Sequence, residues 1–281
     1  MNLSDINTVR SLLQKNGFTF KKSLGQNFLI NPEVCPAMAD AACDKDTGVI
    51  EIGPGIGVLT AELSKRAKRV IAIELDERLK KILPVTLADC DNTEIIYGDV
   101  LKTDLKALIA EKFSDCSSVA VCANLPYYIT SPIVMSLLDS KLPIDSITVM
   151  VQKEAAERLC ANVGTREAGA VSAAVSYYAE PEILFSVGKD SFMPPPKVDS
   201  AVIQLHIREN PPVKVLDEAK FFRLIRASFA QRRKTLVNTV SNTAGIDKES
   251  IKKALAELGL SETVRGERLT LDELAELSNL L

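Results

Sequence analysis

The sequence contains a single histidine, His206, and none of its six cysteines forms a C-x-x-C pair. Structural zinc sites combine four Cys or His ligands at close spacing, so the sequence predicts no metal site. The cysteines are expected to be reduced thiols of a cytoplasmic protein. Asp5 and Arg10 interrupt any apolar run near the start of the chain, so no secretory signal is expected.

An excess of positive charge is also absent, since the net charge is −3 at pH 7. Proteins that bind nucleic acid neutralise its phosphates, so a nucleic-acid partner would require a local basic patch here. Hydrophobic residues make up 46% of the 281 residues and charged residues 25%. This composition is typical of a globular protein with a packed core in one or two domains.

The longest stretch without charge lies between Asp115 and Asp139. It is long enough to cross a bilayer, which needs about 20 residues. However, Asn124, Pro126 and Pro132 would interrupt backbone hydrogen bonding or add a polar group at membrane depth. The stretch therefore predicts a buried strand, a loop and the start of a helix, and no membrane segment.

Short apolar runs alternate with amphipathic stretches from about residue 48 to residue 152. The expected strands lie within residues 48–57, 70–76, 94–99, 118–127 and 145–154, and the expected helices cover residues 33–43, 58–68, 77–87, 105–113 and 131–140. Alternation of this kind is typical of βαβ units. It predicts a mostly parallel sheet with helices on both faces, that is, an α/β fold.

Residues 182–187 and 200–207 are expected to form a late hairpin or edge pair, in which His206 is a strand residue. Residues 209–215 are typical of a linker, and residues 217–281 predict three or four helices. The expected domains are therefore 1–208, which opens with a helix and a basic lead-in, and a small all-helical domain at 209–281.

A glycine loop follows the first expected strand of the α/β region, in EIGPGIG. Gly53, Gly55 and Gly57 allow a sharp turn and a close approach of a ligand to the backbone. Val58 stands where a dinucleotide fingerprint would place its third glycine, and the G-K-[ST] of a phosphate loop is absent. A purely structural strand-to-helix turn is the alternative interpretation.

Acidic residues close the next two expected strands. Glu74 lies at the end of the second expected strand, in VIAIELD. A carboxylate at this position can accept hydrogen bonds from both hydroxyls of a ribose. Asp99 follows IIYG and could bind an adenine edge. These residues indicate a nucleoside-bearing cofactor without a pyrophosphate, and S-adenosylmethionine is the candidate.

The NLPY sequence at 124–127 follows the fourth expected strand. The Asn124 side chain and the Leu125 backbone carbonyl can accept hydrogen bonds from an exocyclic amine, and Pro126 fixes the backbone. Tyr127 offers a flat face for stacking a base, worth about 1–3 kcal/mol. The set is a candidate for methyl transfer to an adenine amine, and a simple turn after a strand is the alternative.

These motifs resemble those of the KsgA-type (RsmA) small-subunit ribosomal RNA adenine dimethyltransferases. The matching blocks are KKSLGQNFL (21–29), EIGPGIGVLT (51–60), VIAIELD (70–76), GD (98–99), NLPYYITSP (124–132), QKE (152–154), FMPPPKVDSAV (192–202) and FAQRRKTL (229–236). Because several blocks occur in order over nearly the whole chain, the resemblance is highly specific.

The resemblance implies a Rossmann-like class I methyltransferase domain and a small helical domain. It implies transfer of two methyl groups to N6 of each of two adjacent adenosines near the 3′ end of small-subunit rRNA, in an immature 30S particle, by a monomer. The cofactor contacts that it implies are Asn27, Leu29, Gly53, Glu74, Asp99 and Asn124. Tyr127 and Phe192 are the implied aromatic residues on either side of the target base.

A basic cluster in the C-terminal region is expected to bind RNA phosphates, although a solvated charged face is the ordinary alternative. The cluster is expected on one helical segment, whose apolar face is formed by Phe221, Phe222 and Phe229. Its basic residues are Arg223, Arg226, Arg232, Arg233 and Lys234. Lys21 and Lys22 add positive charge near the expected cofactor entrance.

Three other functions are compatible with parts of this pattern. The macrolide-resistance methyltransferases, which modify a large-subunit adenine, share some of these motifs, but NLPY and PPPKVDSAV favour the small-subunit class. A non-catalytic assembly or transcription factor could keep the fold while losing Glu74, Asp99 or NLPY, all of which are present. DNA adenine methyltransferases usually carry D-P-P-Y-type residues.

Overall fold

The computed structural model describes residues 1–19, 27–231 and 233–281. The chain forms two compact units, of which one comprises Met1–Ala156 with Glu182–Ile207 and the other Glu157–Pro181 with Arg208–Leu281. The chain leaves the first unit after Ile207, one residue before the expected domain boundary between residues 208 and 209. The sequence does not predict that residues 157–181 pack with the C-terminal helices.

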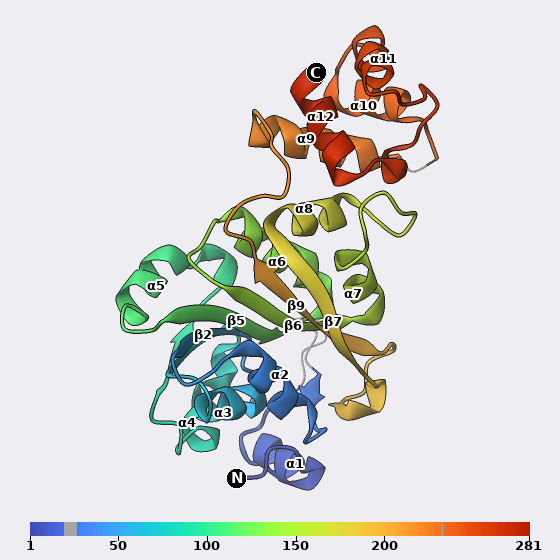
Figure 1. Cartoon of the computed structure of the whole chain (residues 1–281). Helices are drawn as coiled ribbons and strands as arrows, with labels where there is room; N and C mark the ends of the chain where they lie inside the picture. The colour runs from blue at the N-terminus through green and yellow to red at the C-terminus, as the bar shows by residue number, and fades with distance from the viewer. Residues whose placement is uncertain (20–26, 232) are drawn as a thin grey trace. The chain divides into compact units, whose positions relative to one another are not determined.

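A seven-stranded sheet, counted over the described residues, forms the centre of the first unit in the order β4-β3-β2-β5-β6-β9-β7 (Figure 1). The strands are β2 (Thr47–Ile52), β3 (Arg69–Glu74), β4 (Thr93–Tyr97), β5 (Ser118–Asn124), β6 (Ser146–Gln152), β7 (Ala179–Val187) and β9 (Ser200–Ile207). Strands β2 to β6 pair in parallel, and β9 pairs antiparallel with β6. The mostly parallel sheet and the late edge pair are thus confirmed.

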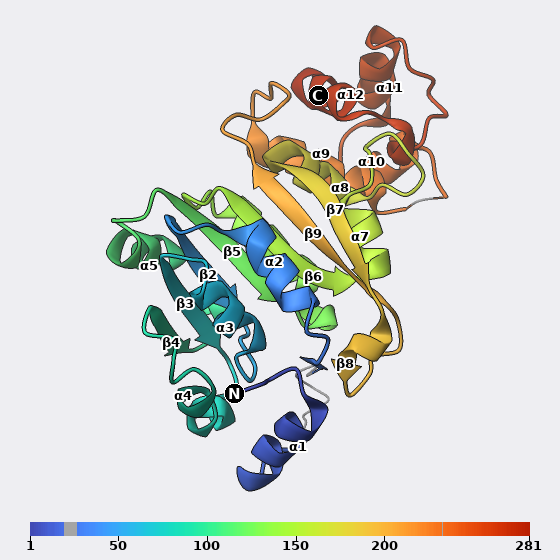
Figure 2. The ribbon, with the colours of Figure 1, turned by 60° about the horizontal axis from the view of Figure 1, so that its bottom comes forward.

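Both faces of the central strands are covered. Val49 and Ile50 of β2 point to opposite faces, and neither is exposed to solvent. The helices in this region are α2 (Val34–Ala42), α3 (Val58–Ser64), α4 (Leu83–Thr86), α5 (Leu105–Lys112), α6 (Thr130–Asp139) and α7 (Lys153–Leu159). Of these, α2 and α3 pack together on one face, which is turned toward the viewer in Figure 2.

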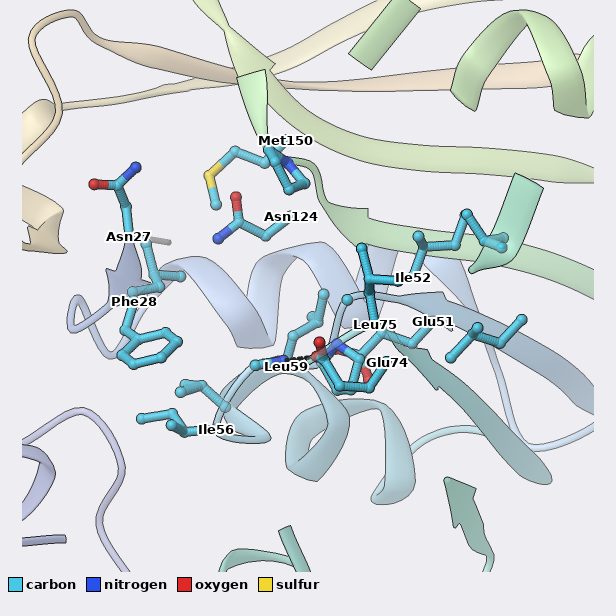
Figure 3. A pocket seen from close by; sticks show the side chains of 18 of the residues that line it. Asn27, Phe28, Glu51, Ile52, Ile56, Leu59, Glu74, Leu75, Asn124 and Met150 are labelled. Carbon is cyan, nitrogen blue, oxygen red and sulfur yellow. Dashed lines mark hydrogen bonds between the residues drawn. The ribbon is translucent and has the colours of Figure 1, made fainter. Parts of the chain in front are cut away.

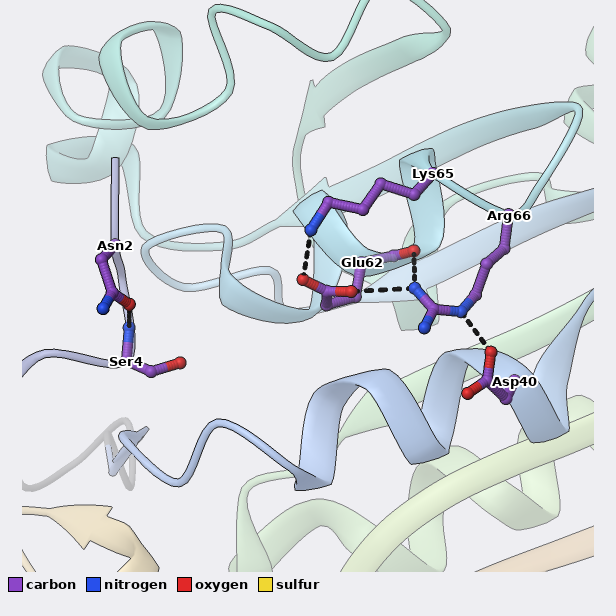
Figure 4. A network of polar contacts seen from close by, with 6 residues as sticks. All are labelled: Asn2, Ser4, Asp40, Glu62, Lys65 and Arg66. Atoms are coloured by element: carbon purple, nitrogen blue, oxygen red, sulfur yellow. Dashed lines mark hydrogen bonds and ion pairs between the residues drawn. The ribbon is translucent and has the colours of Figure 1, made fainter.

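A polar network joins the outer sides of α2 and α3 (Figure 4). The Arg66 guanidinium donates to Asp40 of α2 and, over 2.8 Å, to Glu62 of α3. Lys65 donates to the other oxygen of the Glu62 carboxylate at 2.6 Å. Ion pairs near the surface contribute about 0–1 kcal/mol each, so this network adds little to the stability of the fold.

The N-terminal part of the chain is attached to the unit by a small second sheet. Helix α1 (Ile6–Lys15) begins at Asp5, whose carboxylate accepts a hydrogen bond from the Thr8 N–H at 2.8 Å. Strand β1 (Phe28–Leu29) then pairs antiparallel with β8 (Phe192–Met193). This pairing brings two segments that are far apart in the sequence to the same place, beside the ends of the large sheet.

Two expected elements in the first unit are corrected. The helix expected at 77–87 is split into a 3-10 turn η2 (Glu77–Lys81) and the short α4, because Pro84 lacks the N–H that a continuous helix would need. The strand expected to reach residue 154 ends at Gln152, which pairs with Ser200, the first residue of β9. Helix α7 starts at the next residue.

The second unit is helical. Its helices are α8 (Ala170–Tyr178), α9 (Glu218–Phe229), α10 (Leu236–Ala244), α11 (Lys248–Glu257) and α12 (Leu271–Leu280), with a 3-10 turn η6 (Gly266–Arg268). Tyr177 of α8 packs against Phe221 and Phe222 of α9, with ring centroids 5.3 and 5.2 Å apart. No helix within the described ranges is both long and apolar enough to cross a membrane.

The single helical segment expected for the basic cluster is also corrected. Helix α9 ends at Phe229, and Thr235 caps the next helix by accepting from the Asn238 N–H. Arg233 and Lys234 therefore lie in the turn between α9 and α10, where the Lys234 N–H donates to the Gln231 carbonyl at 3.0 Å.

Candidate active site

The carboxyl ends of the parallel strands meet at one edge of the large sheet. The last residues of β2, β3 and β5 are Ile52, Glu74 and Asn124. All three line one pocket, which also receives residues of the small β1–β8 sheet (Figure 3). Open α/β sheets bind their ligands at this edge, so the pocket is the candidate active site.

Nearly all of the site residues expected in this part of the chain line this one pocket. They are Asn27, Leu29, Gly53, Gly55, Glu74, Asp99, Asn124, Pro126, Tyr127 and Phe192. The exception is Leu125, whose side chain is buried and whose N–H donates to the Met150 carbonyl at 3.1 Å. Tyr128 also lines the pocket and leaves more than half of its side chain exposed.

The structure describes only some of the basic residues that are expected to bind RNA. Arg223 and Arg226 are exposed on α9, and Arg233 and Lys234 are exposed in the following turn. Lys21, Lys22 and Arg232 lie outside the described residues.

The glycine loop after β2 has a left-handed backbone that favours glycine, with φ of 72° at Gly53 and 89° at Gly57. A Cβ at Gly53 would meet no atom within 4 Å, so this glycine leaves the backbone open to a ligand. A Cβ at Gly57 would lie 2.9 Å from the Leu87 side chain. Gly57 therefore serves packing, while Gly53 lines the pocket.

Glu74 is held by the backbone around it. One carboxylate oxygen accepts from the Gly55 N–H at 3.1 Å, and the other accepts from the Asp76 N–H at 2.7 Å. The side chain is buried, and this burial raises the pKa of Glu74, whereas the backbone hydrogen bonds act in the opposite direction. The carboxylate is therefore oriented by the glycine loop itself.

Asp99 lies two residues after β4 and is half-buried. One oxygen of its carboxylate accepts from the Leu101 N–H at 3.1 Å and starts a short 3-10 turn. The carboxylate thus has a local structural contact and also faces the pocket.

Asn124 and two aromatic residues form the other side of the pocket. Figure 3 shows the Asn124 side chain pointing toward Asn27, and its amide forms no hydrogen bond with the described residues. Tyr127 follows in the 3-10 turn η4 (Tyr127–Ile129), and Phe192 comes from β8. Burial raises the pKa of Tyr127, so its hydroxyl stays neutral.

Glu51 is a pocket residue to which the sequence gives no role. Its side chain is 1% exposed, and its Oε2 atom has no hydrogen-bond partner among the described residues. Burial raises the pKa of Glu51 to about 8, and the charge of Glu74 adds to the rise. The sequence feature that could have pointed to Glu51 as a pocket residue is its position at the end of a buried strand, two residues before Gly53.

Replacing Glu51 by glutamine should change how stability depends on pH. The folded protein retains the Glu51 proton up to about pH 8, whereas an unperturbed carboxyl has a pKa of 4.5. The free energy of unfolding of the wild type should therefore fall by up to about 1.4 kcal/mol per pH unit across this window. Glu51→Gln lacks this loss, so its stability relative to the wild type should rise from pH 5 to pH 8.

Urea denaturation at pH 5 and pH 8 measures this effect. The exposed Glu33 provides a matched control, Glu33→Gln, which should leave the pH dependence as in the wild type. An equal stability difference between Glu51→Gln and the wild type at both pH values would contradict a buried, protonated Glu51.

No group of three or more His, Cys, Asp or Glu side chains within the described residues is arranged to hold a metal ion. The six cysteines are free thiols. Burial raises the pKa of Cys35, which lines the pocket.

Comparison with known structures defines the class of the protein. The dimethyladenosine transferase of Plasmodium falciparum is 28% identical, covers 89% of this chain and 95% of its own, and superposes with a TM-score of 0.73. The 23S rRNA methyltransferase ErmE is 26% identical, with coverages of 91% and 99% and a TM-score of 0.68. The fold is therefore that of a class I methyltransferase.

Sequence comparison then identifies the family. The family model described as ribosomal RNA adenine dimethylase matches residues 17–281. Ribosomal RNA small subunit methyltransferase A of Geobacillus thermodenitrificans is 52% identical over 97% of this chain and 94% of its own length. The protein of the same name from Bacillus mycoides is 49% identical, with coverages of 98% and 96%. The chain belongs to the ribosomal RNA adenine dimethylase family.

Proposed function

We propose that this protein transfers methyl groups from S-adenosylmethionine to N6 of two adjacent adenosines near the 3′ end of small-subunit (16S) ribosomal RNA. The product would contain N6,N6-dimethyladenosines. The observation that carries the proposal is the Asn124 amide, which lines the same pocket as Glu74 and has no hydrogen-bond partner among the described residues. The names of the full-length relatives support the choice of RNA.

The pocket residues fit S-adenosylmethionine, which supplies an electrophilic sulfonium methyl when bound. The buried Glu74 carboxylate would accept hydrogen bonds from the two ribose hydroxyls. Asp99 would contact the adenine edge of the cofactor, and Gly53 leaves space for the ligand beside the backbone. Asn27 and Leu29 would enclose the cofactor from the side of β1.

The residues of the NLPY turn would act on the target adenine. Its N6 lone pair is delocalised into the ring, so the amine is a poor nucleophile. The Asn124 amide and the Leu125 carbonyl would accept the two N6–H groups and favour a localised lone pair, while Pro126 holds the turn. Tyr127 and Phe192 would hold the base between them. Positioning provides most of the catalysis, and electrostatic stabilisation is second.

The RNA must present the adenosine outside a helix, because a stacked base cannot enter such a pocket. A flipped or single-stranded base costs a few kcal/mol of stacking energy at most. The exposed Arg223, Arg226, Arg233 and Lys234 would bind phosphates, and the same role is proposed for Lys21, Lys22 and Arg232. The proposal includes a monomeric enzyme that acts in the cytoplasm on an immature 30S particle during ribosome biogenesis.

Mapping of the modified nucleotides tests this function. Small subunits that lack the two dimethylations, and naked 23S rRNA, are each incubated with the protein and labelled S-adenosylmethionine. Dimethylation of two adjacent adenosines near the 3′ end of the small-subunit RNA is expected. Incorporation into 23S rRNA alone would favour a function like that of ErmE instead, and incorporation into neither RNA would favour a non-catalytic assembly factor.

A further inference from the structure

Asp199 and Ser200 lie where β9 begins, and Ser200 pairs with Gln152, the last residue of β6. They belong to the block FMPPPKVDSAV, and Gln152 opens the block QKE. The proposed function uses only Phe192 of these two blocks. Asp199 and Ser200, called here the β9 corner, nevertheless contact the segments that carry Tyr127 and Phe192.

Ser200 contacts Tyr127 directly. The Tyr127 Oη and Ser200 Oγ atoms lie 2.8 Å apart across 73 positions of sequence, and either hydroxyl could be the donor. Ser200 has no exposed surface, whereas Tyr127 is only half-buried. A partly exposed ring can otherwise turn about its side-chain torsions. The hydrogen bond to a buried, rigid strand therefore fixes the direction of the ring.

Asp199 contacts the segment before Phe192. Its Oδ1 atom accepts from the Lys189 N–H at 3.0 Å, and its backbone carbonyl accepts from the Lys153 N–H at 3.0 Å. Lys189 begins the 3-10 turn η5 (Lys189–Ser191), which leads directly into Phe192. Two adjacent residues of the β9 corner thus hold the turn with Tyr127 and the turn before Phe192.

We propose that Ser200 is a positioning residue for methyl transfer, because its buried hydroxyl holds the ring of Tyr127 at the place where it stacks on the target adenine opposite Phe192. The inference rests on the proposed function, in which these two rings hold the base. Ser200 itself does not line the pocket, so its replacement leaves Gly53, Glu74 and Asp99, which are expected to bind the cofactor, unaltered. A misplaced ring would lower the rate of transfer by misaligning the bound base.

The variant Ser200→Ala tests this role. Loss of a neutral hydrogen bond of about 0.5–1.5 kcal/mol corresponds to a decrease in kcat of about two- to tenfold. The dissociation constant of S-adenosylmethionine should be unchanged, and kcat should fall more than KM rises. Ser146 is a suitable control, because it is a buried serine at the other end of the same strand pair, opposite His206. Ser146→Ala should keep the wild-type kcat.

Tyr127→Phe provides a second variant, because it removes the other half of the hydrogen bond and leaves β9 untouched. The double variant Ser200→Ala/Tyr127→Phe should have the kcat of the slower single variant, since both changes remove the same interaction. Multiplicative decreases in the double variant would overturn the inference. A wild-type kcat in Ser200→Ala, or an equal decrease in Ser146→Ala, would overturn it as well.

The two proposals fail in distinguishable ways. If the wild-type protein does not methylate small subunits, the proposed function fails together with the inference. If the wild type dimethylates the expected adenosines and Ser200→Ala does so at the same rate, only the role of Ser200 is refuted.

Discussion

Replacing Asn124 by alanine should remove most methyl transfer and leave cofactor binding nearly intact. The amide is the side chain at the end of β5 that we expect to accept an N6–H of the target adenine. Removal of one such electrostatic contact costs about 100- to 1,000-fold in kcat in other enzymes. The affinity for S-adenosylmethionine should change by no more than about 1–2 kcal/mol, because most of its expected contacts lie elsewhere.

Two measurements check this expectation. Incorporation of labelled methyl groups into undermethylated small subunits gives kcat, and isothermal titration gives the affinity for S-adenosylmethionine. Asn7→Ala, at an exposed asparagine of α1, is the control and should behave as the wild type. Full activity of Asn124→Ala would refute the role of the side chain, and loss of cofactor binding would assign Asn124 to the cofactor instead.

Replacing Glu74 by alanine should weaken S-adenosylmethionine binding about 100-fold. The variant loses hydrogen bonds from two ribose hydroxyls to a charged group, each worth about 1.5–3 kcal/mol, and part of this is recovered by water. It also leaves the Gly55 N–H without its acceptor, so the glycine loop loses the contact that orients it. KM for the cofactor should rise, while kcat at saturating cofactor should change much less.

Titration calorimetry with the wild type, Glu74→Ala and Glu77→Ala measures the difference. Glu77 is exposed three residues after Glu74 and serves as the control, because its loss should not alter the affinity. An unchanged dissociation constant in Glu74→Ala would show that this carboxylate does not bind the ribose.

The large sheet and the pocket could be predicted from the sequence for one physical reason. Parallel strands end at a common edge, so residues that follow different apolar runs are brought together. Gly53, Glu74 and Asn124 are separated in sequence, yet the positions at their strand ends suffice to predict that they share a pocket. Their roles toward cofactor and base stay predictions.

Two of the errors have equally local causes. The pattern at 77–87 has helical spacing, but one missing N–H at Pro84 prevents a continuous helix. The basic residues after Phe229 continue the charge pattern of α9, yet Thr235 starts a new helix and leaves them in a turn. Helices α7 and α8 are not predicted, and the packing of residues 157–181 in the second unit depends on tertiary contacts such as Tyr177 with Phe221.

Individual side-chain hydrogen bonds and the burial of single residues could not be predicted. The hydrogen bond between Tyr127 and Ser200 depends on the position of β9 beside β6, which no local pattern specifies. The same holds for Glu51, whose pKa is raised by burial in the folded chain, which its neighbours in the sequence do not reveal.

The insertion of β9 between β6 and β7 also has a consequence for the order of folding. Strands β2 to β6 can pair as soon as residue 152 is present, whereas Phe192 is added 40 residues later and Ser200 48 residues later. A growing chain can therefore form the sheet edge with Gly53, Glu74 and Asn124 before Phe192 can complete the pocket. The ribosome that synthesises this protein must release the whole of β9 before the chain can complete a site for ribosomal RNA.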